Sequence, residues 1–212
     1  MKTLNKALAA GILCSSAFTA QAAVQVINFD DVTTSPSATI IPDGYSNFDW
    51  DNSANGIYVA DGAAAYPGSG YENGVISGNY VAFSGYDTSP YRVDWLGAGA
   101  IDFIGTYFTS AWSSSQTLSF EGWLNGNQVY TSTDYTINNI NPTLIALGWS
   151  GIDSLVIHNR ANNLSDDSRL HWAMDDFVFN NVSAVPEPST YALMLGGLGL
   201  VGFMASRRRK QA

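Results

Sequence analysis

The stretch Thr117-Leu-Ser-Phe-Glu-Gly-Trp-Leu-Asn-Gly-Asn-Gln-Val-Tyr-Thr131 carries the clearest local structural signal in the chain. Two segments that contain β-branched and aromatic residues flank the dipeptide Asn125-Gly126. Asn and Gly both accept the positive φ angles that a type I′ turn requires, and the twist of that turn matches two antiparallel strands. The stretch therefore predicts a β-hairpin.

Strand signals of the same kind recur on both sides of this hairpin. They predict strands at residues 24–29, 80–83, 101–108, 144–149, 154–158 and 177–182. Residues 40–78 predict mostly loop and turn, the kind of region that often carries binding residues. Since no window between residues 23 and 184 has a helical stripe, we expect an all-β fold, an antiparallel β-sandwich of the jelly-roll type.

The composition agrees with an exported β protein that has one core. Of the 212 residues, 46% are hydrophobic and only 13% are charged, about half the usual charged share. Of the nine basic residues, two precede residue 23 and four follow residue 206. The part between them holds Arg92, Arg160, Arg169 and all 18 acidic residues, so its net charge is 3 − 18 = −15. Such acidity argues against nucleic acid as a partner and suits neutral partners, divalent cations or plain solubility.

The first 22 residues are typical of a signal peptide. Lys2 and Lys6 form a basic region, residues 7–18 are apolar, and Ala20-Gln21-Ala22 places small residues where a signal peptidase cleaves. An N-terminal anchor or a buried helix is the alternative, but the apolar run is shorter than the ~20 residues that span a membrane. The sole cysteine, Cys14, lies within this segment, so we expect no disulfide in the mature chain.

The C-terminal tail differs in kind from the rest. Val185-Pro-Glu-Pro188 interrupts regular structure, residues 191–205 are wholly apolar, and Arg207-Arg-Arg-Lys210 follows. A 15-residue helix is roughly 22 Å long, short of a ~30 Å hydrocarbon core unless its flanking residues help. We expect a marginal transmembrane helix over 190–206, with the basic cluster held on the cytoplasmic side of the inner membrane.

This tail resembles the PEP-CTERM sorting signal of Gram-negative bacteria, which exosortase processes. The resemblance covers the tripartite pattern of motif, Gly-rich apolar helix and terminal Arg cluster at residues 185–210. It implies that Pro186, Glu187 and Pro188 are recognised by the enzyme, and that Arg207, Arg208, Arg209 and Lys210 stop transfer. It also implies an association with exopolysaccharide and biofilm. The alternative is a permanent single-span anchor whose tail survives intact.

Residues 23–184 resemble, more loosely, the jelly-roll domains of PEP-CTERM proteins and carbohydrate-binding modules. The resemblance rests on Ile27-Asn-Phe-Asp-Asp31 and on Trp172-Ala-Met-Asp-Asp-Phe-Val-Phe179. It implies that Asp175, with Asp30 from an adjoining first strand, could ligate a structural calcium, because calcium prefers oxygen ligands. The alternative is that both aspartates serve turns and strand edges without a metal.

Aromatic residues offer the best indication of a ligand. Most of the six tryptophans are expected in the core, but Trp50, between Asp49 and Asp51 in the loop-rich region, is our surface candidate for stacking on a sugar ring. Of the two histidines, His158 is expected to be a satisfied core residue. No nucleophile elbow and no zinc-spaced histidine pair occurs, so we expect no catalytic residues.

The sequence thus predicts three parts: a signal peptide at 1–22, a β-sandwich at 23–184 and a sorting signal at 185–212. We expect a non-enzymatic protein that is exported through the inner membrane and resides, after processing, in the envelope, at the cell surface or in the extracellular matrix. A lectin-like carbohydrate-binding module or a carbohydrate-active enzyme is the alternative. Extracellular polysaccharide is the expected ligand class.

Overall fold

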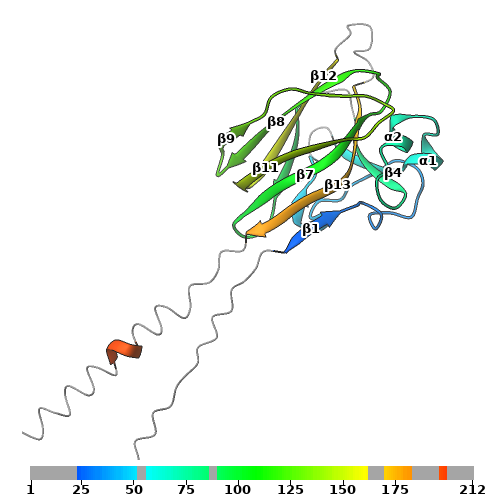
Figure 1. Cartoon of the computed structure of the whole chain (residues 1–212). Coiled ribbons are helices and arrows are strands. Elements are labelled where there is room, and N and C mark those ends of the chain that lie inside the picture. The colour runs from blue at the N-terminus through cyan, green and yellow to red at the C-terminus, as the bar shows by residue number, and fades with distance from the viewer. Residues whose placement is uncertain (1–22, 52–55, 86–89, 162–169, 183–195, 200–212) are drawn as a thin grey trace, which may run out of the picture. The chain divides into compact units, whose positions relative to one another are not determined.

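The computed structural model describes residues 23–51, 56–85, 90–161, 170–182 and 196–199. Two antiparallel sheets stack into a sandwich within the compact unit Ala22–Ala184 (Figure 1), which confirms the predicted fold class. The elements in chain order are β1 (Val24–Ile27), β2 (Thr39–Ile40), a 3-10 turn (Tyr45–Asn47), β3 (Phe48–Asp49), β4 (Ile57–Asp61), α1 (Gly62–Ala65), α2 (Gly70–Asn73), β5 (Tyr80–Ser84), β6 (Tyr91–Trp95), β7 (Ala100–Ser110), β8 (Gln116–Leu124), β9 (Asn127–Thr131), β10 (Tyr135–Ile137), β11 (Thr143–Ile152), β12 (Ser154–Ala161) and β13 (Trp172–Val182).

Sheet A has seven strands in the order β11-β7-β13-β5-β4-β2, with β1 also paired to β13. The first and last strands therefore adjoin, as the sequence predicts, with Val24 opposite Asn180 and Ile27 opposite Phe177. An irregularity follows Asp175, where Asp176 has φ 51°. Because this irregularity divides β13, β5 pairs with its first part and β1 with its second.

Sheet B has six strands in the order β10-β8-β12-β6-β3, with β9 also paired to β8. The predicted hairpin is confirmed, because β8 and β9 pair up to Leu124 and Asn127 around Asn125 (φ 51°) and Gly126 (φ 75°). The Asp153 carboxylate accepts a hydrogen bond from the Asn125 N–H at 2.7 Å, which fixes the turn to the start of β12.

The main core lies between the two sheets and is rich in aromatic residues. Phe48 is central, because its ring lies 5.0–5.4 Å from the rings of Trp50, Trp95, Phe177 and Phe179. Ring pairs at tilted and edge-on angles add to the free energy of burying their large apolar surfaces. This packing stabilises a domain whose described part contains no cysteine.

Residues 40–78 contain more regular structure than the sequence predicts. Two one-turn helices, α1 and α2, contradict the expectation of no helix, because a four-residue helix is too short to display a 3.6-residue period. Side chains cap both helices: Asp61 accepts from the Ala64 N–H, and Ser69 accepts from the Tyr71 N–H. Both helices pack on the outer face of sheet A.

This packing creates a second, smaller apolar cluster, separate from the main core. Its buried members come from sheet A, from α2 and from the segment after β7: Ala60, Tyr71, Val81, Phe83, Ala111 and Ala173. Figure 1 shows α1 and α2 beside β4. One outer face of the sandwich is thus covered by the chain itself.

The predicted signal peptide at 1–22 and nearly all of the predicted helix at 190–206 lie outside the described residues. Residues 1–21 and 185–212 form a second unit of the chain. Only residues 196–199 of this unit are described, and they form one helical turn. Within the described ranges, no helix has both the length and the apolarity to cross a membrane.

Candidate functional site: the outer face of sheet B

The outer face of sheet B is built by the alternation of residues along β8. Leu118 and Phe120 are buried in the main core. Because successive side chains of a strand point to opposite faces, Ser119, Glu121 and Trp123 point outward, and all three are partly exposed. The strand that the sequence identifies most clearly therefore carries an aromatic ring and a carboxylate on its solvent side.

Strand register brings residues of β6 and β8 together across β12. Val156 of β12 is opposite both Glu121 and Arg92, while Ser154 is opposite both Trp123 and Asp94. Val156 is only 5% exposed and Ser154 only 2%, although both occupy outward positions. Small residues in the central strand leave room for the longer side chains of its neighbours to meet above them.

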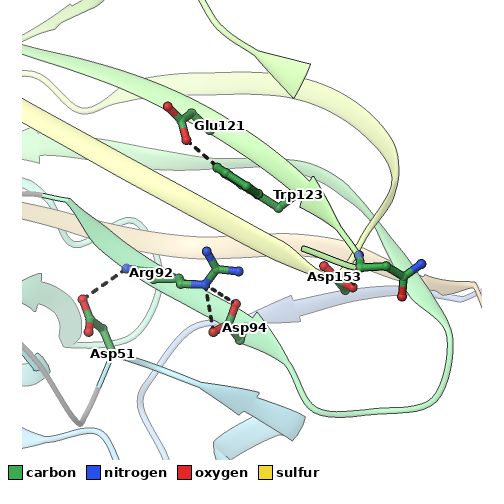
Figure 2. A network of polar contacts seen from close by, with 7 residues as sticks. Asp51, Arg92, Asp94, Glu121, Trp123 and Asp153 are labelled. Atoms are coloured by element: carbon green, nitrogen blue, oxygen red, sulfur yellow. Dashed lines mark hydrogen bonds and ion pairs between the residues drawn. The ribbon is translucent and has the colours of Figure 1, made fainter. Parts of the chain in front are cut away.

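Those side chains form one continuous network (Figure 2). The Arg92 Nε–H group donates to both carboxylate oxygens of Asp94, at 2.8 and 3.0 Å, and its guanidinium carbon lies 5.8 Å from the centre of the Trp123 ring. The Trp123 indole N–H donates to Glu121 at 2.9 Å. A cation over an aromatic ring is attracted by the ring's electron-rich face, so Arg92 and Trp123 orient each other. Asp51 accepts from the Arg92 backbone N–H at 3.1 Å.

A groove of about 320 Å³ continues this network along β8 and β12. Its lining residues are mostly polar: Thr117, Ser119, Glu121, His158, Asn159 and Arg160. His158 Nε2 lies 3.2 Å from Glu121 Oε1, and the His158 side chain is 38% exposed. The expectation that His158 is a core residue is therefore wrong, because the neighbouring Ile157, not His158, faces the core.

Charges on this face are balanced locally. Arg92 is paired with Asp94, and Arg160 with Asp134, which lies before β10. Two of the three arginines between the predicted signal and the C-terminal cluster thus lie here, each beside a carboxylate. Glu121 contacts Trp123 and His158 rather than an arginine, so the face offers many donors and acceptors around one aromatic ring and keeps a small excess of carboxylates. It is suited to a neutral, hydroxyl-rich ligand rather than to an ion.

Trp50, the predicted stacking residue, belongs to the core. Its exposed fraction is 0%, its ring lies 5.4–5.5 Å from the rings of Phe29, Phe48 and Phe177, and its indole N–H donates to the Tyr45 carbonyl. The flanking Asp49 and Asp51 are partly exposed instead. No ring face of Trp50 remains for a sugar, so we correct this assignment.

Asp30 and Asp175, the predicted calcium ligands, hold the same segment of backbone. Asp175 Oδ2 accepts from the N–H groups of Ile76 and Ser77 at 2.7 and 2.9 Å. Asp30 Oδ1 accepts from the N–H groups of Asn79 and Tyr80 at 2.8 and 3.1 Å. The two aspartates thus anchor residues 76–80 from either end.

This donor set does not fit a calcium site. Calcium takes six to eight oxygen ligands, whereas the carboxylate oxygens just described point at N–H groups. Among the residues that the structure describes, no three acidic, histidine or cysteine side chains gather closely enough to hold an ion. The geometry agrees with the alternative weighed from the sequence, in which both aspartates serve the backbone.

Among the described residues, Asp175 and Tyr45 have raised pKa values, and both belong to structural contacts away from the groove. Burial raises the pKa of Asp175 to about 7, although its backbone hydrogen bonds oppose that rise. Burial also raises the pKa of Tyr45, whose hydroxyl donates to Asp31. Neither lines the sheet B groove.

Sequence reasoning missed Trp123, Glu121 and Arg92, although a signal for them was present. Along β8, the two apolar residues Leu118 and Phe120 alternate with polar ones, and Trp123 falls on the polar side. The same alternation places Trp50 with apolar Phe48. Counting residues by two from Phe48 and from Phe120 would have separated the buried tryptophan from the accessible one.

The predicted sorting residues Pro186, Glu187, Pro188 and Arg207 to Lys210 lie outside the described residues. They fall within residues 184–210, which match the model of the PEP-CTERM protein-sorting motif. The chain carries a PEP-CTERM sorting motif. The motif indicates an exported protein that is sorted to the cell envelope or surface.

Solved structures similar to this chain include carbohydrate-binding modules, all at low identity. The CBM22-1-CBM22-2 tandem domain of Paenibacillus barcinonensis Xyn10C has a TM-score of 0.44 and 14% identity, over 81% of this chain and 49% of that one. The CBM22-1-GH10 modules of Clostridium thermocellum xylanase Xyn10B, solved with xylohexaose, have a TM-score of 0.37 and 12% identity, over 54% and 24%. The CBM51 of Clostridium perfringens GH95, solved with methyl-galactose, has a TM-score of 0.35 and 15% identity, over 74% of this chain and 99% of that one.

The chain thus spans about half the length of the first of these structures and a quarter of the second. No curated protein matches the sequence. The geometry of the chain's own residues must therefore carry any functional conclusion about the domain.

Proposed function

We propose that this chain is an exported, non-enzymatic surface or matrix protein that binds a neutral polysaccharide on the outer face of sheet B. The observation that carries the proposal is the network of Arg92, Trp123 and Glu121 beside the groove. Trp123 supplies apolar ring surface for the C–H face of a sugar. The paired charges supply directional hydrogen bonds to its hydroxyl groups.

An exosortase-type enzyme processes the C-terminal tail in this proposal, after transient retention at the inner membrane. The domain then remains in the envelope or extracellular matrix, where exopolysaccharide or biofilm glycans are its ligands. The excess of acids over bases in the exported part favours neutral over anionic chains, because like charges repel.

The test is affinity electrophoresis of the purified full chain in gels that contain xylan, galactan, dextran or the anionic polymer alginate. We expect a neutral polysaccharide to retard the wild type and alginate not to. Trp123→Ala should clearly weaken that retardation, because one stacking contact with its bonded neighbours contributes about tenfold to the affinity of the sheet B site.

Leu144→Ala is the matched control, because Leu144 is an apolar residue of sheet A that is 52% exposed and lies outside the groove. It should bind like the wild type. Equal retention of wild type and Trp123→Ala, or retention by none of the neutral polymers, would contradict the proposal.

A further inference from the structure

The covered face of the sandwich carries a second groove, which the proposed function does not use. Its volume is also about 320 Å³, and aromatic side chains dominate its lining: Tyr58, Tyr66, Tyr71, Phe83, Trp112 and His171. The groove lies where α1 and α2 meet strands β4 and β5 of sheet A. Tyr71 and Phe83 are buried in the second apolar cluster and Tyr58 and Tyr66 pack against it, whereas Trp112 is exposed at its edge.

Trp112 is the accessible ring of this groove. Its exposed fraction is 40%, yet edge-on contacts hold it against Tyr66 (6.2 Å, 90°) and Tyr71 (5.5 Å, 74°). The Tyr66 and Tyr71 rings lie 4.5 Å apart and are inclined by only 30°, so Trp112 forms a corner with this pair of rings. A flat ring entering such a corner can stack on one surface and meet the edge of another.

Local hydrogen bonds fix this corner in advance of any ligand. In the turn between α1 and α2, Glu72 accepts from the Gly68 N–H at 2.6 Å, and the Ser69 hydroxyl donates to the Tyr66 carbonyl. The Gly70 N–H donates to the Ala111 carbonyl at 2.8 Å, which ties α2 to the residue next to Trp112. Because the rings are ordered beforehand, a ligand loses little free energy in arranging them.

The chemistry of the lining selects an uncharged occupant. Among the residues that the structure describes, no Asp, Glu, Lys or Arg lines this groove, although the domain around it is strongly acidic. Tyrosine hydroxyls and the His171 ring supply polar atoms at the edges of the apolar surfaces. A neutral sugar ring, with apolar C–H faces and a polar rim, matches this arrangement.

We propose that the groove at Tyr66, Tyr71 and Trp112 is a second sugar-binding site. This inference rests on the proposed function of the sheet B face and extends it. The two sites belong to the outer faces of different sheets, with the main core between them. One domain then holds two polysaccharide chains at once and cross-links them.

The test uses the purified full chain and beads coated with the xylan, galactan or dextran that retards it in gels. We expect the wild type to bind and agglutinate the beads. Trp112→Ala and Trp123→Ala should each still bind, with the number of sites halved in calorimetric titrations with xylohexaose, galactotriose or isomaltohexaose, and neither should agglutinate. In the double variant each site should bind about tenfold more weakly, so no site of wild-type affinity should remain.

Trp112→Phe, which keeps an aromatic ring, should restore part of the agglutination, and Leu144→Ala should leave it unchanged. Agglutination by Trp112→Ala at the wild-type level would overturn the second site and leave the sheet B proposal intact. Loss of all binding in Trp112→Ala alone would instead overturn the sheet B site. Sedimentation of the free proteins must show the same monomer mass, because a dimer that Trp112→Ala dissolves would mean that a second copy occupies the groove.

Discussion

The two outer faces of the sandwich use carboxylates in opposite ways. On the face of sheet A, Asp175 is fully buried beneath residues 76–80 and accepts hydrogen bonds from their backbone. On the face of sheet B, Asp94 and Glu121 are partly exposed and meet side chains, Arg92 in one case and Trp123 and His158 in the other. Only the second arrangement leaves carboxylate atoms available to a ligand.

The difference follows from what covers each sheet. Sheet A carries α1, α2 and the segment that follows them, and these elements bury apolar residues such as Phe83 and Tyr71. Sheet B carries no such cover among the described residues, so its outward positions hold polar side chains that neutralise one another. An aspartate in this chain is therefore structural or functional according to the partner its strand position provides.

The strongest test of the comparison is to lift the cover from sheet A. In Gly70→Ala the new Cβ would lie 1.8 Å from the Ser110 carbonyl oxygen, so α2 must move away from β7. We expect the free energy of unfolding to fall by about 4 kcal/mol or more, because a backbone atom cannot yield as a side chain does. Urea unfolding of the full chain measures it.

Ala63→Ser is the control for Gly70→Ala, since Ala63 of α1 is exposed and an added hydroxyl meets solvent. It should change the stability by less than about 0.5 kcal/mol. A loss below about 1 kcal/mol in Gly70→Ala would mean that α2 is not seated on sheet A as described.

The next test concerns the anchor of that cover. Burial raises the pKa of Asp175 from 3.8 to about 7. A group that binds its proton more tightly when folded adds stability below its unfolded pKa and loses it as pH rises through the folded pKa. Between pH 4 and pH 8, the free energy of unfolding of the wild type should thus fall by on the order of 3 kcal/mol relative to that of Asp175→Asn.

Chemical unfolding of both proteins across that range gives the comparison, since other titrating groups contribute equally to each. Calcium or EDTA should leave both curves unchanged, because the Asp175 oxygens are committed to N–H groups. If the unfolding free energies of the two proteins changed with pH in parallel, burial would not raise the pKa of the Asp175 carboxylate. A calcium-dependent shift would restore the metal site expected from the resemblance.

The sequence predicts the architecture better than the site, for a physical reason. Asn125-Gly126 determines its turn locally, and strand composition is visible without knowledge of strand partners. The site depends on Arg92 and Trp123 meeting across β12, which requires the strand order and register of sheet B. These are long-range properties that no local pattern contains.

The helices show the complementary limit. Asp61 and Ser69 are ordinary capping residues, but each starts a helix of only four residues whose apolar partners lie on β5 and β13. Tertiary packing, not local propensity, therefore fixes this segment. Residues 40–78 look like loop in the sequence because their order comes from sheet A.

The smallest expected effect is on the open face. Arg160→Gln removes the ion pair with Asp134, whose two side chains are 61% and 54% exposed. We expect a stability change below about 0.5 kcal/mol, because water screens exposed pairs.

Arg160 also lines the sheet B groove, so the same variant should weaken polysaccharide retention several-fold. Asp134→Asn, which breaks the same pair but lies outside the groove lining, is the control and should retain the glycan. Equal loss of affinity in both variants would mean that the ion pair itself, and not a contact between Arg160 and the glycan, supports binding. A loss confined to Arg160→Gln would separate binding from stability, as a face that the fold leaves uncovered should allow.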